Sequence, residues 1–301
     1  MSTAPEASPP DAPSGRAPRQ GDPLPDVHNV LLVMSGKGGV GKSTVAANLT
    51  LALKRKGYRV GLLDADMYGP SVPTMFGITG KPTTNGQKII PLERFGVKLM
   101  SIGFLLDDAR AAVVWRGPML HGALTQFIAD VAWGPLDYLV VDLPPGTGDV
   151  ALTLSQKLAV SGSVIVTTPQ EVALADVYKS VSMNEKVGIP IAGVVENASY
   201  FVCDGCDKRH ELYGSGGGQK VADMAGAPLL ASLPLDISVR SWGDAGTPVV
   251  QAAPTSPIGL AFLELADRVV QRLEEMNESA DAGPAIDRSG GQNRHLPITK
   301  G

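Results

Sequence analysis

Residues 36–43 read Gly-Lys-Gly-Gly-Val-Gly-Lys-Ser and match G-x-x-x-x-G-K-S/T, the pattern of a phosphate-binding loop. The stretch lies between an apolar run, 30–34, and a segment with helical spacing of apolar residues, 42–56. Glycines let backbone N–H groups converge on phosphate oxygens, and the start of a helix adds its dipole. The sequence therefore predicts nucleotide contacts from the whole loop: Gly36, Lys37, Gly38, Gly39, Val40, Gly41, Lys42, Ser43 and Thr44.

The two lysines of this loop have different expected roles. We expect Lys42 to reach the β- and γ-phosphates of ATP, and Ser43 beside it to ligate Mg²⁺. Lys37 is an extra lysine that cradling phosphate does not require. Taken alone, it is compatible with a side chain that simply faces solvent.

Three aspartates follow predicted strands at the ends where nucleotides bind parallel sheets. Asp142 comes after the apolar run 138–141, a Walker B pattern, and is expected to hold Mg²⁺ through water. Asp64 and Asp66 follow the run 59–63, and one of them should orient or deprotonate the attacking water. We expect Asp64 to support the site or join the Mg²⁺ shell. A turn-capping role is the alternative for both.

Apolar runs alternate with helical patterns along the middle of the chain. Runs that are apolar on both faces and separated by helices predict a mostly parallel sheet covered on both sides, a three-layer α/β fold. We expect one domain over 27–276, with disordered tails at 1–26 and 277–301. The expected strands cover 30–34, 59–63, 97–104, 138–141, 163–168, 191–195 and 229–233, and the expected helices cover 42–56, 121–132, 149–159, 171–187 and 257–276.

Composition excludes several classes of protein. The chain has 301 residues and a formal net charge of −4, which argues against a nucleic-acid-binding protein held by bulk charge. It has no apolar run long enough to cross a membrane and no N-terminal secretory pattern, so we expect a cytoplasmic protein without a membrane partner. Its 2 cysteines are too few for a fold of this size to be held together by disulfides, which excludes a disulfide-rich scaffold.

Both cysteines, Cys203 and Cys206, lie in a predicted loop over about 197–218. A C-x-x-C pair supplies two thiolates, whereas a tetrahedral Zn²⁺ or a 4Fe–4S cluster takes four ligands. A two-fold dimer would supply the other two. The alternatives are a zinc site that adds His210, a redox pair of the thioredoxin kind, and inert cysteines.

The loop form K-G-G-x-G-K-S/T resembles the deviant Walker A family of ATPases, which includes the septum-site ATPase MinD. Further stretches narrow the resemblance to the Mrp/ApbC-type iron–sulfur cluster carrier ATPases, over roughly residues 27–272. They are SGKGGVGKST, DADMYGPSVPTMFG, DLPPGTGD, VENASYFVCDGC, YGSGGG and LPLDISVRSWGDAGTPVV.

This resemblance implies ATP binding, slow ATP hydrolysis, a homodimer and a labile 4Fe–4S cluster that is passed to recipient apoproteins. It implies that Lys37 reaches the partner's nucleotide and that Asp66 acts on water. Adenine contacts are implied for Asn197, with help from the loop around Pro234 and Asp236. Many members carry a small extra domain before the ATPase, where this chain has a proline-rich tail.

Two other classes of function compete with a cluster carrier. A MinD-like positioning ATPase would need a basic amphipathic helix at the C-terminus to bind membrane. The segment 257–276 is instead expected to pack its apolar residues into the core. A P-loop enzyme acting on a small metabolite, such as a biotin-pathway ligase, would leave the cysteine pair unexplained.

Overall fold

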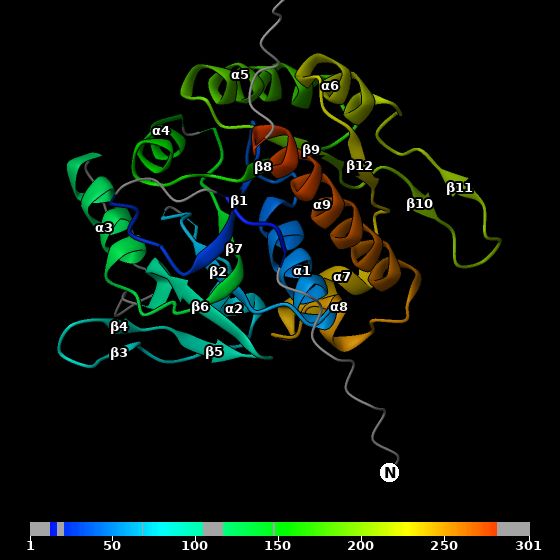
Figure 1. The fold of residues 1–301 in the computed structure, drawn as a ribbon. Helices are drawn as coiled ribbons and strands as arrows, with labels where there is room; N and C mark the ends of the chain where they lie inside the picture. Colours follow the sequence, from blue (N-terminus) through cyan, green and yellow to red (C-terminus); the bar gives the residue numbers. More distant parts are fainter. Residues whose placement is uncertain (1–12, 17–20, 68, 105–116, 147, 282–301) are drawn as a thin grey trace, which may run out of the picture.

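The runs of buried aliphatic residues pair into one eight-stranded sheet (Figure 1). The structure is a computed structural model that describes residues 13–16, 21–67, 69–104, 117–146 and 148–281. The strands of the sheet, in spatial order, are β12 (Leu229–Ser232), β9 (Ile191–Glu196), β8 (Gly162–Thr167), β1 (Val27–Met34), β7 (Leu136–Asp142), β2 (Val60–Asp64), β6 (Val97–Ser101) and β5 (Leu92–Arg94).

All neighbouring strands of this sheet are parallel except the edge strand β5, which runs antiparallel to β6. Strand β1 lies between β7 and β8, so the loop that follows it leaves the middle of the sheet. In the register of β2 and β7, Asp64 lies directly beside Asp142. The parallel arrangement therefore brings two of the predicted aspartates together.

Helices cover both faces of the sheet, which confirms the predicted three-layer architecture. Along β1, Leu31 and Val33 face a core formed with α1 and α9, whereas Val30 and Leu32 face one formed with α3 and α4. The α-helices are α1 (Lys42–Arg55), α2 (Val72–Met75), α3 (Gly117–Ala129), α4 (Gly148–Lys157), α5 (Glu171–Val187), α6 (Gly217–Ala225), α7 (Ile237–Asp244), α8 (Val249–Ala252) and α9 (Pro257–Asp281).

Every strand and helix predicted from the sequence is present, with ends that differ by a few residues. The 97–104 strand ends earlier, because residues Ile102–Phe104 form a short 3-10 helix. The cysteine segment is more ordered than a loop, since it contains an antiparallel hairpin of β10 (Phe201–Val202) and β11 (Arg209–His210). A second small hairpin pairs β3 (Thr83–Thr84) with β4 (Ile89–Ile90).

Some residues of the expected tails belong to the folded part. Leu24 is buried in the core, and the Arg16 side chain is paired with Asp22. Helix α9 continues to Asp281, beyond the expected boundary at 276. The rest of both expected tails, 1–12, 17–20 and 282–301, lies outside the described residues.

Helix α9 packs along α1 on one face of the sheet (Figure 1). Phe262, Leu265, Val269 and Leu273 on this helix are buried in the core, as predicted for a packed helix. Leu260, expected on the same core face, is instead exposed. Among the helices of the described residues, none combines the length and the apolar character that crossing a membrane requires.

Two glycines bring α2 and α7 into backbone contact. Gly77 follows α2 with φ 59°, and Gly246 follows α7 with φ 74°. A Cβ atom on Gly246 would lie 2.6 Å from the Cα atom of Gly77. Both the backbone conformation and the lack of space therefore require glycine at 246.

We predict that Gly246→Ala lowers the free energy of unfolding by about 2–4 kcal/mol, because alanine meets both a left-handed backbone and the Gly77 backbone. Gly243→Ala is the matched control, since a Cβ there meets nothing within 4 Å and Gly243 lies inside α7. The control should be neutral or gain up to about 1 kcal/mol. Urea unfolding measures both, and equal effects would contradict the contact.

Candidate functional site

The phosphate-binding loop has the geometry that its sequence predicts. Gly39 and Gly41 adopt positive φ angles of 82° and 85°, and Gly41 caps α1 without any side-chain cap. Because no side chain caps α1, the backbone N–H groups of its first turn are available to phosphate oxygens. The loop surrounds a cavity of about 290 Å³ lined by Lys37, Lys42 and Ser43 among others.

Neighbouring elements hold this loop closely in place. A Cβ on Gly36 would lie 2.4 Å from the backbone of Asp176 in α5, so the loop starts in direct contact with that helix. Asn197, which follows β9, donates from its side-chain amide to the Val40 carbonyl at 2.9 Å. The loop is thus fixed from two sides by residues more than a hundred positions away in the sequence.

Lys42 is the centre of a buried ionic cluster. Its Nζ atom donates to Asp142 Oδ1 at 2.6 Å and lies 3.3 Å from Ser43 Oγ. Asp66 Oδ2 is 3.8 Å from the same nitrogen. The strand ends and the first turn of α1 therefore bring together four residues that the sequence predicted as site residues.

Asp142 has the character of a magnesium ligand. Burial raises the pKa of its carboxyl group, against the lowering effect of the Lys42 ammonium beside it. Its Oδ2 atom is buried and has no hydrogen-bond partner among the described residues. An unpaired buried carboxylate oxygen next to the Ser43 hydroxyl fits the oxygen ligands that Mg²⁺ prefers.

Asp64 is occupied by bonds within the protein. Its Oδ1 accepts from the backbone N–H of Asp66 at 3.1 Å, and its Oδ2 accepts from the N–H of Val72 at 3.2 Å and from Ser101 Oγ at 3.0 Å. Burial and the neighbouring Asp142 raise the pKa of Asp64 to about 7. These bonds favour the supporting role over the Mg²⁺ shell, because they tie the backbone at Asp66 and at Val72 to the ends of β2 and β6.

Asp66 and Lys37 both line the phosphate cavity. The backbone N–H of Gly69 donates to Asp66 Oδ1 at 3.3 Å, so the other oxygen points towards Lys42. This position is suited to a water that attacks the terminal phosphate. Lys37 is partly exposed, as a residue that serves a second copy would need to be.

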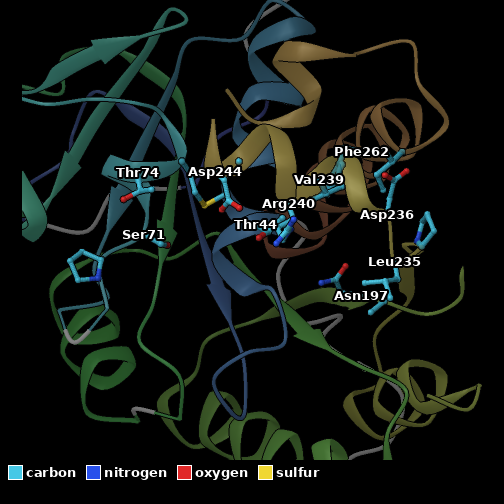
Figure 2. A pocket seen from close by; sticks show the side chains of 16 residues that line it. Thr44, Ser71, Thr74, Asn197, Leu235, Asp236, Val239, Arg240, Asp244 and Phe262 are labelled. Atoms are coloured by element: carbon cyan, nitrogen blue, oxygen red, sulfur yellow. The ribbon is translucent and has the colours of Figure 1, made fainter. Parts of the chain in front are cut away.

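A second cavity of about 460 Å³ adjoins the phosphate cavity, because Thr44, Ser71 and Met75 line both. Asn197, Pro234 and Asp236, for which the resemblance implies adenine contacts, all line it. Figure 2 shows Thr44, Asn197, Asp236 and Arg240 around the same space. We call this second cavity the base-end cavity, after the role that the resemblance implies for Asn197, Pro234 and Asp236.

Sequence reasoning missed several lining residues of this second cavity. They come from α7 and α9 and are Val239, Arg240, Asp244 and Phe262 (Figure 2). The stretch that contains Arg240 and Asp244 supported the resemblance, but no helix was predicted there. Asp236 also caps that helix, because its carboxylate accepts from the N–H and the hydroxyl of Ser238 at 2.7 and 2.6 Å.

The cysteines lie in the turn of the β10–β11 hairpin. The N–H of Cys203 donates to the Lys208 carbonyl at 3.0 Å, and the N–H of Asp207 donates to the Cys203 carbonyl at 2.8 Å. Hydrogen bonds to the Cys203 sulfur from the Gly205 backbone first, and then from Cys206, lower the pKa of that thiol. A lowered thiol pKa favours the thiolate, which is the form that binds metal.

Both thiols are free, with Cys203 half-buried and Cys206 exposed. His210, the third ligand of the zinc alternative, pairs with Phe201 across the hairpin. No group of three or more His, Cys, Asp or Glu side chains that could hold a metal ion occurs in the part of the chain that the structure describes. This part therefore offers a metal the pair of thiols without a third ligand.

The stem of the hairpin is bound to the wall of the base-end cavity. The N–H of Leu235 donates to the Tyr200 carbonyl at 2.6 Å, and the N–H of Ser199 donates to the Leu233 carbonyl at 2.8 Å. Buried Glu196 accepts from Ser199 Oγ and from the N–H of Gly218 at the start of α6. The end of β9 therefore connects the phosphate loop, the base-end cavity and the cysteine turn.

Residues 26–270 match the family model described as ParA: NUBPL iron-transfer P-loop NTPase. The chain belongs to this iron-transfer P-loop NTPase family. It is 51% identical over 253 residues to an iron–sulfur cluster carrier protein of Aquifex aeolicus, covering 83% of this chain and 70% of that protein. It is 54% identical over 246 residues to a protein of the same name from Pseudomonas fragi, covering 81% of this chain and 85% of that one.

Solved structures share the fold of this chain. A nucleotide-binding protein of Archaeoglobus fulgidus, solved with ADP, has a TM-score of 0.68 and 38% identity, covering 80% of this chain and 93% of that one. The cell-division ATPase MinD of Pyrococcus furiosus has a TM-score of 0.60 at 22% identity, covering 81% and 98%. MinD therefore shares the fold of this iron-transfer NTPase.

We predict that Lys42 and Asp66 contribute to hydrolysis by different routes. Lys42→Ala should weaken ATP binding about 10–100-fold, because it removes a charged donor from the phosphates. Asp66→Ala should leave ATP affinity nearly unchanged and lower the hydrolysis rate by about 10²–10⁴-fold, since a general base acts in the transition state. Calorimetric titration and phosphate release measure the two effects. Equal losses of affinity would contradict this division of roles.

Proposed function

We propose that the chain is an ATP-hydrolysing carrier that holds a 4Fe–4S cluster between two copies and transfers it to apoproteins. The observation that carries this proposal is the cysteine turn. Cys203 and Cys206 present two free thiols, one of them with a lowered pKa, on a hairpin bound to the nucleotide pocket. Membership of the iron-transfer family supports iron as the cargo.

The number of thiols supports sharing of the cluster between chains. A 4Fe–4S cluster takes four ligands, and each chain brings two cysteines. A two-fold axis beside the hairpin would place two Cys203 and two Cys206 side chains around one cluster. The partly exposed Lys37 supports the same dimer, since in this proposal it contacts the nucleotide of the partner.

The nucleotide end divides its work among the clustered residues. When ATP binds, Lys42 leaves its contact with Asp142 and turns to the β- and γ-phosphates. Ser43 and Asp142 would hold Mg²⁺, which would supply positive charge to the phosphates. Asp66 takes a proton from the water that attacks the γ-phosphorus, and Asp64 keeps Asp66 in position through its backbone bond.

The same segments connect nucleotide and cluster. Asn197 contacts the phosphate loop, and the hairpin that carries the cysteines begins a few residues later. The 234–236 loop lines the base-end cavity and holds the hairpin stem through Tyr200. A change at the nucleotide therefore has a short covalent and hydrogen-bonded route to the thiols.

Transfer requires an exchange of ligands without a change of oxidation state. A thiolate of the recipient forms a bond to iron as the bond from iron to Cys203 or Cys206 breaks. The released thiolate takes up a proton from solvent, and the recipient thiol has lost one. The exposed position of Cys206 suits this exchange, because an incoming ligand can approach the iron.

We predict that anaerobic reconstitution with iron and sulfide loads about four irons per dimer, as expected for one 4Fe–4S cluster. Cys203→Ser or Cys206→Ser should abolish iron binding and leave ATP affinity unchanged, since neither cysteine lines the phosphate or base-end cavity. Iron analysis, absorbance spectra and ATP titration test this.

Asp207→Asn is the matched control, because it alters the same turn without removing a thiol and should retain the cluster. A cluster that survives in the double cysteine variant would refute the site. Recovery of one zinc per chain with no iron would instead favour the zinc alternative.

A further inference from the structure

An apolar groove runs beside the cysteine hairpin and adjoins the base-end cavity at the 234–236 loop. It has a volume of about 820 Å³ and lies between the hairpin, the 234–236 loop, α7 and the start of α9. Its apolar walls include Tyr200, Phe201, Val202, Leu235, Ile237 and Trp242. In Figure 1, β10 and β11 project from the β12 edge of the sheet, beyond α9.

Large apolar side chains on the walls of this groove are open to solvent. The exposed fraction is 64% for Ile237, 41% for Trp242, and 40% for both Val202 and Leu235. A folded chain that exposes several such side chains around one hollow presents a surface for another polypeptide. Tryptophan and other large apolar residues in a hollow are the usual anchors of such a contact.

The groove has an acidic edge. The charged side chains that line it are Asp204 and Asp236. Within the part of the chain that the structure describes, neither forms an ion pair. Asp204 lies between the two cysteines in the turn. A partner that fits this surface therefore brings an apolar segment flanked by basic side chains.

We propose that this groove docks the apo form of a protein that receives the cluster, through an apolar segment flanked by Lys or Arg. This inference rests on the proposed carrier function. Ligand exchange needs the recipient's thiolate within bonding distance of the iron, so the docking surface must adjoin the cysteines. Val202 and Asp204, the chain neighbours of Cys203, both line the groove.

Charge complementarity favours a basic segment of a recipient. Such a segment meets the apolar walls and the carboxylates of Asp204 and Asp236 at the same time.

The groove also shares a wall with the base-end cavity. Pro234, Leu235 and Asp236 line both hollows, one on each side of the 234–236 loop. If a nucleotide moved this loop, it would change the shape of the docking surface, and docking would then alter nucleotide affinity by the same factor.

The test measures binding of a dye-labelled apo-ferredoxin of the 4Fe–4S type, extended by an apolar segment flanked by lysines, to the cluster-loaded carrier by fluorescence anisotropy. Three single variants are compared: Ile237→Lys, Ile237→Asp and the control Met224→Lys. Met224 is 43% exposed on α6 and does not line the groove, so it reports any general effect of adding a surface charge.

We expect Ile237→Lys to weaken binding at least about tenfold, because it removes an apolar anchor and repels a basic partner. Ile237→Asp should weaken it only about two- to threefold, since the added carboxylate attracts the same partner. Met224→Lys should bind like the parent protein. Iron content, ATP affinity and release of iron to a small chelator should be unchanged in all three variants.

Several outcomes would overturn the inference. They are failure of the apo-ferredoxin to bind, equal binding by the Ile237 variants and the parent, and weaker binding by Ile237→Asp than by Ile237→Lys. A change of molecular mass in light scattering of Ile237→Lys would identify the groove as an interface between copies. Tighter ferredoxin binding after deletion of residues 282–301 would identify this chain's own C-terminal segment as the occupant.

Cluster transfer to the same ferredoxin separates this inference from the proposed function. Binding that depends on Ile237 without any movement of the cluster would support the docking surface and refute the carrier. Saturable transfer that all three variants perform like the parent would support the carrier and refute the groove.

Discussion

Parallel strands end at one edge of a sheet, and every functional element of this protein is attached to that edge. Strand β1 leads into the phosphate loop, β2 into Asp66, β7 into Asp142 and β9 into Asn197 and the cysteine hairpin. The 2.6 Å contact between Lys42, at the start of α1, and Asp142, at the end of β7, joins the phosphate loop to the neighbouring strand. The end of β9 therefore links the phosphate loop to the cysteine hairpin, through the bond from Asn197 to Val40.

The architecture could be predicted because its signals are local and strong. A strand buried on both faces must be mostly apolar, and β1, β7 and β8 contain the continuous apolar runs 30–34, 138–141 and 164–166. The phosphate loop and the aspartates could be placed for the same reason, since each follows such a run directly. Parallel pairing then determines that Asp64 and Asp142 become neighbours.

Other features depend on contacts that no local pattern contains. Helix α7 has few buried residues and was not predicted, so Arg240 and Asp244 were missed as lining residues of the base-end cavity. The bonds that occupy both oxygens of Asp64 come from Asp66, Val72 and Ser101 on three different segments. The apolar groove arises only when the hairpin, α7 and α9 meet, because each contributes a few exposed side chains.

The most direct test of a cluster shared between copies is the iron content of a mixed dimer. One copy keeps its cysteines, the other carries Cys203→Ser and Cys206→Ser, and two different affinity tags isolate the mixed species for anaerobic reconstitution. A mixed dimer has two thiols in all, so we expect it to bind ATP and to retain no stable 4Fe–4S cluster. One intact cluster per mixed dimer, held as firmly as in the parent, would show that a single chain suffices and would contradict the shared site.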